Sequence, residues 1–368
     1  MLYGLPKING VSSSDAVDFD WDRYRKNKRM AFMTTRFFTV PAMLMLLIVV
    51  TACAPSSAAL NTTTAIPSNV TIASTASPLA TNQPTTVSKV LTIGEIASSP
   101  SAVIPKFQPM ADYLAAHLSS FGYTSGNVKV APDFATMINW LKNGDIDIVV
   151  DSVYPTMVMV DQAGVKPILR RWKSGTEQYY TVLFARNDAN IQSVQDLRGK
   201  MVALEEPTST SGYMLPKAYL ISAGLNLTEK PSAEAPVASN EVGYVFTRPD
   251  NDVDIIQWVL SGKTPAGAVN SATFDSFSAE SKKSLVVLGK TEIVARHVVS
   301  VRADLDVKAV DALKQILLQM DSSADGKAVL KSFENTTKFD AFPAGIETTL
   351  SRMRELFALT SAKPAEVF

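Results

Sequence analysis

The sequence predicts an α/β fold for the greater part of the chain. From Lys89 onward, short apolar runs alternate with amphipathic stretches, the pattern that produces βα units and mainly parallel sheets. The chain has 368 residues, which is more than one compact core usually contains, so two lobes are expected beyond the N-terminal region. Polar loops follow several of the predicted strands, and in open α/β sheets ligands bind beyond the carboxyl ends of the strands.

The first half of the folded region contains three predicted strands and two predicted helices. We expect the strands at residues 90–94, 128–130 and 146–150, and the helices at residues 104–118 and 135–141. The uninterrupted apolar run of the third strand indicates burial on both faces of its sheet. Helical spacing of apolar residues in the first helix predicts a buried face, made of Phe107, Met110, Ala111 and Leu114.

The second half continues the alternation. We expect strands at residues 181–185, 201–204, 243–246, 266–269, 285–288 and 298–302. We expect helices at residues 211–223, 307–320, 324–333 and 345–357, and Gly224 is a suitable C-cap for the first of them. The division into lobes is therefore predicted to be residues 89–180 with 284–368 for lobe 1, and residues 181–283 for lobe 2.

A hydroxyl-rich segment lies at the entrance of the predicted helix 211–223. After strand 201–204 the chain continues as EEPTSTSGY, residues 205–213. A helix start offers free backbone N–H groups and the positive end of the helix dipole, and hydroxyls add donors that can surround an oxyanion. An ordinary N-cap is the alternative, but one cap needs only one hydroxyl. The excess favours anion binding by Ser209, Thr210 and Ser211.

The same segment, extended through Leu215 and Pro216, resembles the phosphate/phosphite/phosphonate (PhnD-like) substrate-binding protein family of ABC importers. Further stretches agree with that family in order, namely QPMADYL (108–114), GDID (144–147), YYTV (179–182), SVQDLRGK (193–200) and AGAV (266–269). The resemblance implies a two-lobed periplasmic-binding-protein (type II) fold with a hinge between the lobes. It also implies a small oxyanion ligand, an ABC permease and ATPase as partners, a monomer, no cofactor and no metal.

The resemblance further implies which residues contact the ligand. Ser209, Thr210 and Ser211 match serines and a threonine that take the oxyanion in the family. A second set lies in the family's cleft loop, where a common Gly-Pro pair is replaced in this chain. That set is Asp151, Ser152 and Tyr154.

Asp151 is unusual in an anion site because a carboxylate repels a dianion. It would bind a cationic substituent, share a proton with the ligand, or cap the helix beginning near Pro155. Tyr179 matches an aromatic residue of the family at the lobe crossing, with strand packing as the alternative. Asn270 stands where many members carry Asp, and an amide can donate as well as accept.

Two further features bear on this site. The histidine-acidic pair that many relatives carry is absent, and the acidic segment around residues 250–254 stands in its place. Arg296 precedes strand 298–302 and would add a cation to the site. Arginine is mostly exposed in proteins, so we interpret Arg296 as a solvated surface residue.

The N-terminal region predicts export and lipid anchoring. Basic residues at positions 23–36 precede an apolar run at residues 37–52, which has signal-peptide length and is short for a membrane span. The run ends in VTAC, which resembles the bacterial lipobox, so residues 1–52 are expected to be a signal peptide and Cys53 to be lipidated. A start at Met30 or Met33 would give this peptide an ordinary n-region. The alternative is a marginal membrane anchor with an incidental cysteine.

The segment after Cys53 is expected to be a tether. Residues 54–88 consist mainly of Ser, Thr, Ala, Pro and Asn, have no charged residue, and are too poor in large apolar groups to pack. We therefore expect residues 53–88 to connect a lipid anchor to the folded region. The mature protein is expected on the extracytoplasmic side of the membrane, on the periplasmic side or at the cell surface.

Composition excludes several other classes. Lys and Arg number 35 and balance 35 Asp and Glu, which disfavours nucleic acid as a partner. The chain has one Cys and two His, so Cys-rich zinc sites and disulfide frameworks are excluded. No Gly-x-Ser-x-Gly, His-Glu-x-x-His or P-loop pattern occurs, which disfavours an enzyme. A ligand-sensing lipoprotein, or a binding protein for a sulfonate, remains the alternative.

Overall fold

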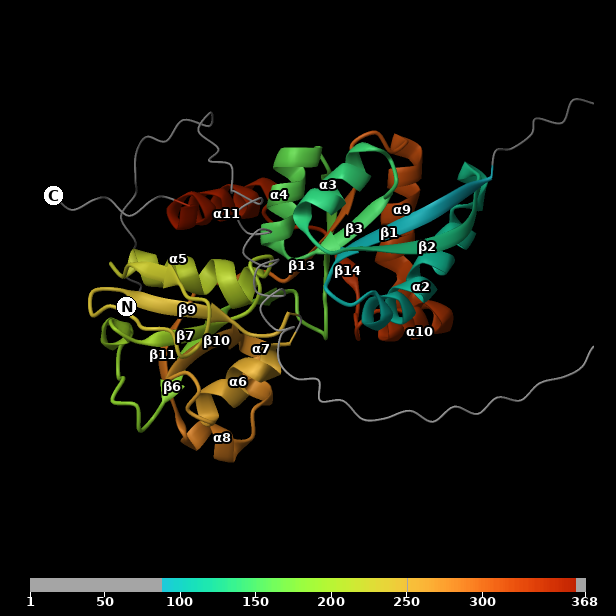
Figure 1. Ribbon diagram of the computed structural model, residues 1–368. Helices are drawn as coiled ribbons and strands as arrows, with labels where there is room; N and C mark the ends of the chain where they lie inside the picture. Colours follow the sequence, from blue (N-terminus) through green and yellow to red (C-terminus); the bar gives the residue numbers. More distant parts are fainter. Residues whose placement is uncertain (1–87, 250, 362–368) are drawn as a thin grey trace, which may run out of the picture. The chain divides into compact units, whose positions relative to one another are not determined.

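The computed structural model describes residues 88–249 and 251–361, which contain two six-stranded mixed sheets, each with its own helices (Figure 1). The first sheet has the strand order β14-β4-β13-β3-β1-β2. Its strands are β1 (Lys89–Ile96), β2 (Tyr123–Ala131), β3 (Ile148–Asp151), β4 (Lys166–Arg171), β13 (His297–Val301) and β14 (Phe339–Asp340). The helices beside it are α2 (Pro100–His117), α3 (Phe134–Lys142), α4 (Val153–Ala163), α9 (Val307–Gln319) and α10 (Ala324–Ser332).

Both faces of the first sheet are buried. One hydrophobic cluster joins the sheet to α2, α9 and α10, and another joins it to α3 and α4. The predicted buried face of α2 is confirmed, since Phe107, Met110, Ala111 and Leu114 are each at most 1% exposed. All four residues of β3 are buried, as the apolar run predicted.

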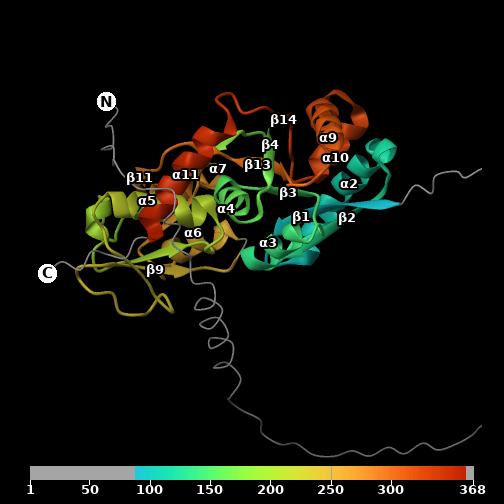
Figure 2. The ribbon, with the colours of Figure 1, turned by 90° about the horizontal axis from the view of Figure 1, so that it is seen from above.

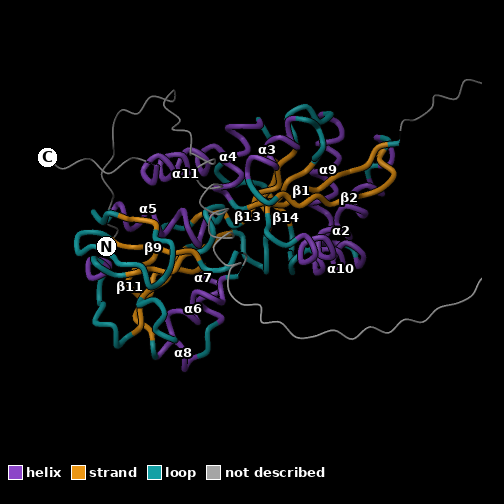
Figure 3. The backbone as a smooth tube through the Cα atoms, viewed as in Figure 1, coloured by secondary structure: helices purple, strands orange, loops and turns teal. Residues whose placement is uncertain are grey.

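The second sheet has the order β11-β6-β10-β7-β9-β8. Its strands are β6 (Thr181–Arg186), β7 (Met201–Leu204), β8 (Leu227–Glu229), β9 (Val242–Phe246), β10 (Ala266–Asn270) and β11 (Leu285–Lys290). Its helices are α5 (Leu215–Ser222), α6 (Asp252–Leu260), α7 (Ser271–Ser276) and α8 (Ala279–Lys283). The core residues of α5 and α6 belong to separate hydrophobic clusters, so these helices cover different faces of the sheet (Figure 3).

The chain crosses between the sheets twice, and the two crossings pair with each other. The outgoing crossing contains β5 (Gln178–Tyr179) and the return contains β12 (Val294–Ala295). These strands form an antiparallel pair, with Tyr179 opposite Val294. The last helix, α11 (Ile346–Ser361), contacts α4 beside the first sheet and α5 beside the second (Figure 2).

The prediction of mainly parallel sheets is wrong. In the first sheet, β13 runs antiparallel to β3 and to β4, and in the second sheet β6 runs antiparallel to β10 and to β11. The cause is the double crossing, because β6 and β13 are each entered directly from the other sheet and not through a right-handed βαβ crossover. In addition, β11 pairs with β6, so residues 285–290 lie in the second sheet although the predicted boundary at residue 284 placed them in lobe 1.

Several strands and helices were not predicted from the sequence. The strand β4 contains Arg170 and Arg171, which mask its apolar pattern. The helix α6 begins within the acidic segment, where the side chain of Asn251 accepts a hydrogen bond from the N–H of Val253, an N-cap contact. Acidic residues in the first turn of a helix interact favourably with the positive end of the helix dipole. The acidic segment therefore stabilises the start of α6.

The N-terminal predictions concern residues outside the described part of the chain. The predicted signal peptide, Cys53 and the tether up to residue 87 all lie there. Within residues 88–249 and 251–361, no helix combines the length and apolar character that crossing a bilayer requires.

Candidate functional site: hydroxyl groups at the junction of the two sheets

Two loops that leave the carboxyl ends of buried strands meet in the structure. One follows β3 and begins α4, and the other follows β7 and leads to α5. The second loop contains Ser209, Thr210 and Ser211, which we call the hydroxyl cradle. The helix there opens as a π-helical turn, Thr210–Met214, before α5 begins. Such π turns are frequent at functional sites.

Thr210 joins the two loops. Its Oγ1 donates a hydrogen bond to Ser152 Oγ at 2.8 Å and accepts one from the backbone N–H of Tyr154 at 3.0 Å. The side chain is almost fully buried, at 1% exposed. Three predicted site residues from two distant loops are therefore in direct contact, through one hydroxyl group.

Asp151 continues this line of hydrogen bonds. Its Oδ1 accepts from the backbone N–H of Ser152 at 2.6 Å and from Ser152 Oγ at 3.2 Å. Burial raises the pKa of Asp151 from its ordinary value to about 7, while the hydrogen bonds from Ser152 and the charge of Lys173 oppose the rise. Ser152, and not Asp151, occupies the N-cap position of α4. The carboxyl group of Asp151 thus titrates near neutral pH within the junction.

Ser209 and Ser211 have different surroundings from Thr210. The Oγ of Ser209 accepts from the N–H of Gly212 at 2.9 Å, which is an N-cap contact, and the Ser209 hydroxyl also hydrogen-bonds to Glu205. A Cβ at Gly212 would lie 2.3 Å from Glu205 Oε2, so glycine is needed there for Glu205. The carbonyl of Ser211 accepts from Thr181 Oγ1 at 2.7 Å.

Tyr179, on β5, lies beside the cradle. Burial raises its pKa to about 12, and Arg296 and hydrogen bonds with Thr210 and Ser211 act in the opposite direction. The ring is only 6% exposed. Its phenol is therefore positioned at the two inner hydroxyls of the cradle, next to the crossing between the sheets.

Tyr154 and Asn270 have side chains in other surroundings. The ring of Tyr154 packs against Phe134 and Phe357, with centroids 5.7 and 5.8 Å away, so its backbone N–H, and not its phenol, is the group in contact with Thr210. Burial raises the pKa of the Tyr154 phenol above its ordinary range. Asn270 caps α7 by accepting from Thr273 N–H at 2.9 Å, and its Nδ2 donates to Asp252 at 2.5 Å.

An acidic network connects Asn270 to the cradle. Glu205 hydrogen-bonds to Asp252 and to Ser209, and burial raises the pKa of Glu205 well above its ordinary value, with Asp252 and Glu206 adding to the rise. Asn270 is therefore connected to Ser209 through two carboxyl groups, those of Asp252 and Glu205. The sequence analysis noted Glu205 and Asp252 without a role, since only the fold brings them together.

Arg296 corrects a prediction. It was interpreted as a solvated surface residue, but it is only 9% exposed. Its guanidinium carbon lies 5.2 Å from the centroid of the Tyr179 ring. Packing at the β5–β12 crossing buries this side chain. This burial could not be predicted from the residues that neighbour Arg296 in the sequence.

Further charged groups surround the same region. Burial raises the pKa of Glu95, at the end of β1, well above its ordinary value, and the charges of Asp151 and Glu334 add to the rise. Arg171 and Lys173 share Glu334, at 3.1 and 2.9 Å. Burial lowers the pKa of His297 well below its ordinary value, and Lys173, Arg171 and Arg296 lower it further. Glu95 comes directly after the predicted strand 90–94 and lies in the carboxyl end of β1, and this position was the available signal.

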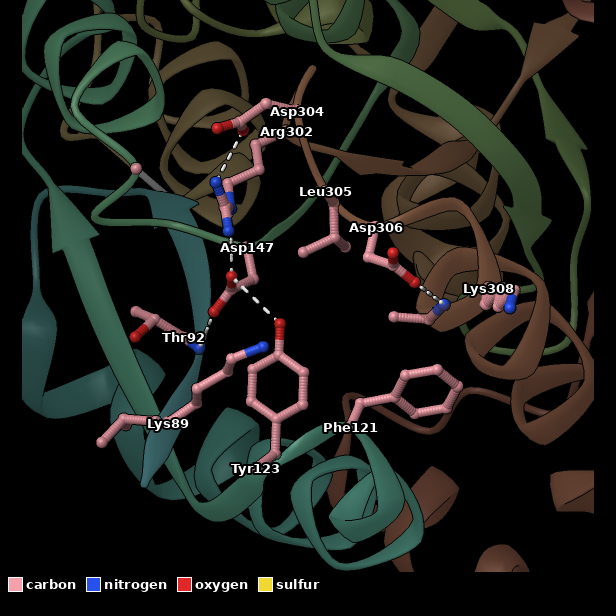
Figure 4. Close-up of a pocket in the computed structure, with 13 residues that line it drawn as sticks. Lys89, Thr92, Phe121, Tyr123, Asp147, Arg302, Asp304, Leu305, Asp306 and Lys308 are labelled. Atoms are coloured by element: carbon pink, nitrogen blue, oxygen red, sulfur yellow. Dashed lines mark hydrogen bonds and ion pairs between the residues drawn. The ribbon is translucent and has the colours of Figure 1, made fainter. Parts of the chain in front are cut away.

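A pocket of about 700 Å³ lies elsewhere on the first sheet (Figure 4). It is lined by residues from the start of β1, including Lys89 and Thr92, and by Asp147, whose carboxylate binds Arg302 Nε at 3.1 Å. None of the eight predicted binding residues lines it. The described residues also include no group of three or more His, Cys, Asp or Glu side chains arranged to hold a metal ion.

Comparison with known proteins shows the family of this chain. A family described as "ABC transporter, phosphonate, periplasmic substrate-binding protein" matches residues 93–343. The phosphate-import protein PhnD of Mycolicibacterium smegmatis is 24% identical over 212 residues, which cover 55% of this chain and 62% of that protein. The chain thus spans somewhat less than two thirds of the length of that relative.

Two solved structures show the similarity in three dimensions. A Xanthomonas citri protein bound to ATP has a TM-score of 0.67 and 28% identity, covering 74% of this chain and 97% of that one. PhnD1 of Prochlorococcus marinus in complex with methylphosphonate has a TM-score of 0.54 and 18% identity, covering 73% and 97%. The latter likeness shows the two-lobed periplasmic-binding-protein (type II) fold. The family is a substrate-binding component of transporters and not an enzyme family, and this chain belongs to the phosphonate periplasmic substrate-binding proteins of ABC transporters.

Proposed function

We propose that this chain captures a small oxyanion of the phosphate, phosphite or phosphonate class and delivers it to an ABC permease and ATPase. The observation that carries the proposal is the contact of Thr210 with Ser152 and with the N–H of Tyr154, which brings the cradle against the loop of the other sheet. Phosphate, methylphosphonate and ATP, which are named for the relatives, all present phosphorus-bound oxyanions. Such a group matches the donors at this junction.

The ligand would replace hydrogen bonds that the protein now makes with itself. Thr210 donates to Ser152, and Ser152 donates to Asp151. If the loops separate, the proton of Thr210, the proton of Ser152 and the N–H of Tyr154 become available to an oxyanion. The two sheets then act as the two lobes, and the paired crossings β5 and β12 act as the hinge between them. The chain functions as a monomer in this proposal and needs no cofactor.

A ligand screen tests this function. We expect phosphate, phosphite, methylphosphonate or 2-aminoethylphosphonate to raise the unfolding temperature of the full-length chain purified in mild detergent. A ligand at a hundred times its Kd adds about 2.7 kcal/mol to the free energy of unfolding. For a domain of this size, the unfolding temperature then rises by roughly 5–10 °C. Sulfate and an alkyl sulfonate serve as controls. A rise with the sulfonate alone, or with none of these anions, would reject the proposed ligand class.

We also propose that the protein is a lipoprotein anchored through Cys53 on the extracytoplasmic side of the membrane. The motif VTAC at residues 50–53, after an apolar run of signal-peptide length, supports this proposal. Two or more acyl chains hold a protein on a bilayer far more firmly than one chain can. The charge-free tether would then let the folded region reach its permease.

Cys53→Ser is expected to abolish anchoring. In a bacterial host, the wild-type chain should sediment with membranes and take up radiolabelled palmitate. The variant should take up no label and should either appear in the soluble fraction or accumulate as an uncleaved precursor. Ser57→Ala, in the same segment, serves as the matched control and should behave like the wild type. Identical partitioning of Cys53→Ser and wild type, with neither labelled, would contradict lipidation.

A further inference from the structure

Arg296 is a buried guanidinium that has no acidic partner among the residues that the structure describes. It follows β12 directly and is 9% exposed. Its Nε and Nη1 are buried, and neither has a hydrogen-bond partner within residues 88–249 and 251–361. A buried charge without hydrogen bonds is costly, and buried polar groups in native proteins are nearly always satisfied. Two charged donors at this position therefore require an acceptor that residues 88–249 and 251–361 do not supply.

The other buried arginines of the described chain differ from Arg296 in this respect. Arg170 donates to both oxygens of Asp340, at 2.9 and 2.6 Å. Arg171 donates to Thr336, to the carbonyl of Phe333 and to Glu334, at 2.8, 2.8 and 3.1 Å. Both arginines are thus held by partners within the first sheet and its helices. Arg296 alone among these three has free donors, which distinguishes a structural arginine from one that is kept for a ligand.

Arg296 lies near the cradle, next to the ring of Tyr179. Its guanidinium carbon lies 5.2 Å from the centroid of the Tyr179 ring, and the phenol of Tyr179 hydrogen-bonds with Thr210 and Ser211. One aromatic ring therefore separates the free donors of Arg296 from the inner hydroxyls of the cradle. Arg171 and His297 interact electrostatically with Arg296, and Glu95 interacts with Asp151 and with Arg171. Arg296 contributes a positive charge that no carboxylate of the described part of the chain neutralises by direct contact.

We propose that Arg296 binds the anionic group of the ligand through its unpartnered Nε–H or Nη1–H and thereby selects ligands that carry a full negative charge at the Tyr179 side of the cradle. This inference rests on the proposed function and adds a positively charged donor to the hydroxyls and backbone N–H groups of the site. The Nε–H and Nη1–H bonds of a guanidinium point in different directions, so each donates to a separate acceptor, as Arg302 does to Asp147 and Asp304. A charged donor makes a short and strong hydrogen bond with a negatively charged phosphate or phosphonate oxygen. A neutral hydroxyl site does not distinguish an anion from a neutral polar ligand as strongly.

Substitution of Arg296 tests the proposal on the full-length chain. The probes are inorganic phosphate and methylphosphonate, and affinity is measured by calorimetry with the unfolding temperature recorded in parallel without ligand. We expect Arg296→Gln to weaken binding of the probe that the wild type binds by about ten- to a hundred-fold. Arg296→Lys keeps the charge but loses the planar guanidinium donors, so a smaller loss is expected. Without ligand, Arg296→Gln should unfold at the wild-type temperature or above, because an unpaired buried charge is removed.

Arg170→Gln is the matched control. It removes an equally buried arginine whose partner is Asp340, so it should lower the unfolding temperature and leave the affinity unchanged. If Arg296→Gln binds the probe like the wild type, the inference is overturned while the proposed function stands. If Arg296→Gln is destabilised like Arg170→Gln and binds normally once folded, Arg296 is structural, which also overturns the inference. If the wild type binds neither phosphate nor methylphosphonate, the proposed ligand class is rejected, and the inference about Arg296 is rejected with it.

Discussion

Thr210→Val is expected to weaken binding of the oxyanion by about ten- to a hundred-fold, because a hydrogen bond to a charged group contributes about 1.5–3 kcal/mol. Valine has nearly the same shape as threonine, so the change removes the hydroxyl and leaves the volume. The same change leaves the N–H of Tyr154 without its 3.0 Å partner. The unfolding temperature without ligand should therefore also fall, by an amount that reflects about 1–3 kcal/mol. Calorimetry well below that temperature measures the affinity of folded protein.

Ser209→Ala is the matched control for Thr210→Val. The Ser209 hydroxyl is already used by the N–H of Gly212 and by Glu205. Its loss should cost about 1 kcal/mol of folding stability, as for other N-caps, and should change the affinity little. Ser211→Ala should lie between the two, because its hydroxyl lies beside the phenol of Tyr179. If all three variants bind like the wild type, the oxyanion is bound elsewhere and the cradle must be given up as the site.

Asp151→Asn is expected to stabilise the protein above neutral pH. Burial raises the pKa of Asp151 from 3.8 to about 7. At about 1.36 kcal/mol for each tenfold change in proton affinity, the cost of holding this group ionised in the fold is on the order of 4 kcal/mol. Asparagine keeps an oxygen that accepts from the N–H and the hydroxyl of Ser152, now at 2.6 and 3.2 Å. The variant should therefore gain on the order of 2–4 kcal/mol in free energy of unfolding at pH 8.

The pH dependence identifies the group responsible. Between about pH 4 and pH 7 the folded chain keeps the proton of Asp151 while the unfolded chain loses it, so stability falls as the pH rises through this window. Below the window both forms are protonated and the variant should gain nothing. Lys173, Glu206, Glu95 and Tyr179 face this carboxyl group and contribute to the wild-type curve. The difference between the wild-type and Asp151→Asn curves isolates Asp151, and it is measured by urea unfolding from pH 4 to pH 8.

Asp147→Asn is the control for this experiment. Asp147 lies next to the same strand, but its carboxylate pairs with Arg302 Nε at 3.1 Å and accepts from the N–H of Thr92 at 2.9 Å. Loss of that pair should destabilise the protein at pH 8.

Ligand binding gives a second measurement of the charge on Asp151, because an ionised Asp151 repels an anion. The affinity of the wild type for the ligand should therefore fall as the pH rises through about 7. The affinity of Asp151→Asn should not fall. If the difference in free energy of unfolding between the wild type and Asp151→Asn does not change with pH, Asp151 does not titrate between about pH 4 and pH 7.

The sequence predicted the elements wherever a local apolar pattern was sufficient. The strand at residues 201–204 has the predicted bounds, and the face of α2 that contains Phe107 and Leu114 is buried as expected. The strand β4 was missed because Arg170 and Arg171 interrupt its apolar run. Their partners Asp340 and Glu334 lie more than a hundred and sixty positions further along the chain, as the separations of 170 and 163 residues show. Such a strand is stable only in the assembled sheet, so no local window could identify it.

By itself the sequence determined the α/β class, the family resemblance and the segment with the hydroxyl groups, because each of these is written in short runs of neighbouring residues. Tertiary structure alone decided what the members of that segment do. It gave Ser209 a capping contact and Thr210 a contact with Ser152, it buried Arg296 beside Tyr179, and it placed Asp151 where burial raises its pKa. Burial, charge neutralisation and hydrogen-bond partners depend on residues that are distant in the chain, and a local pattern contains no information about which of those distant residues will be brought into contact.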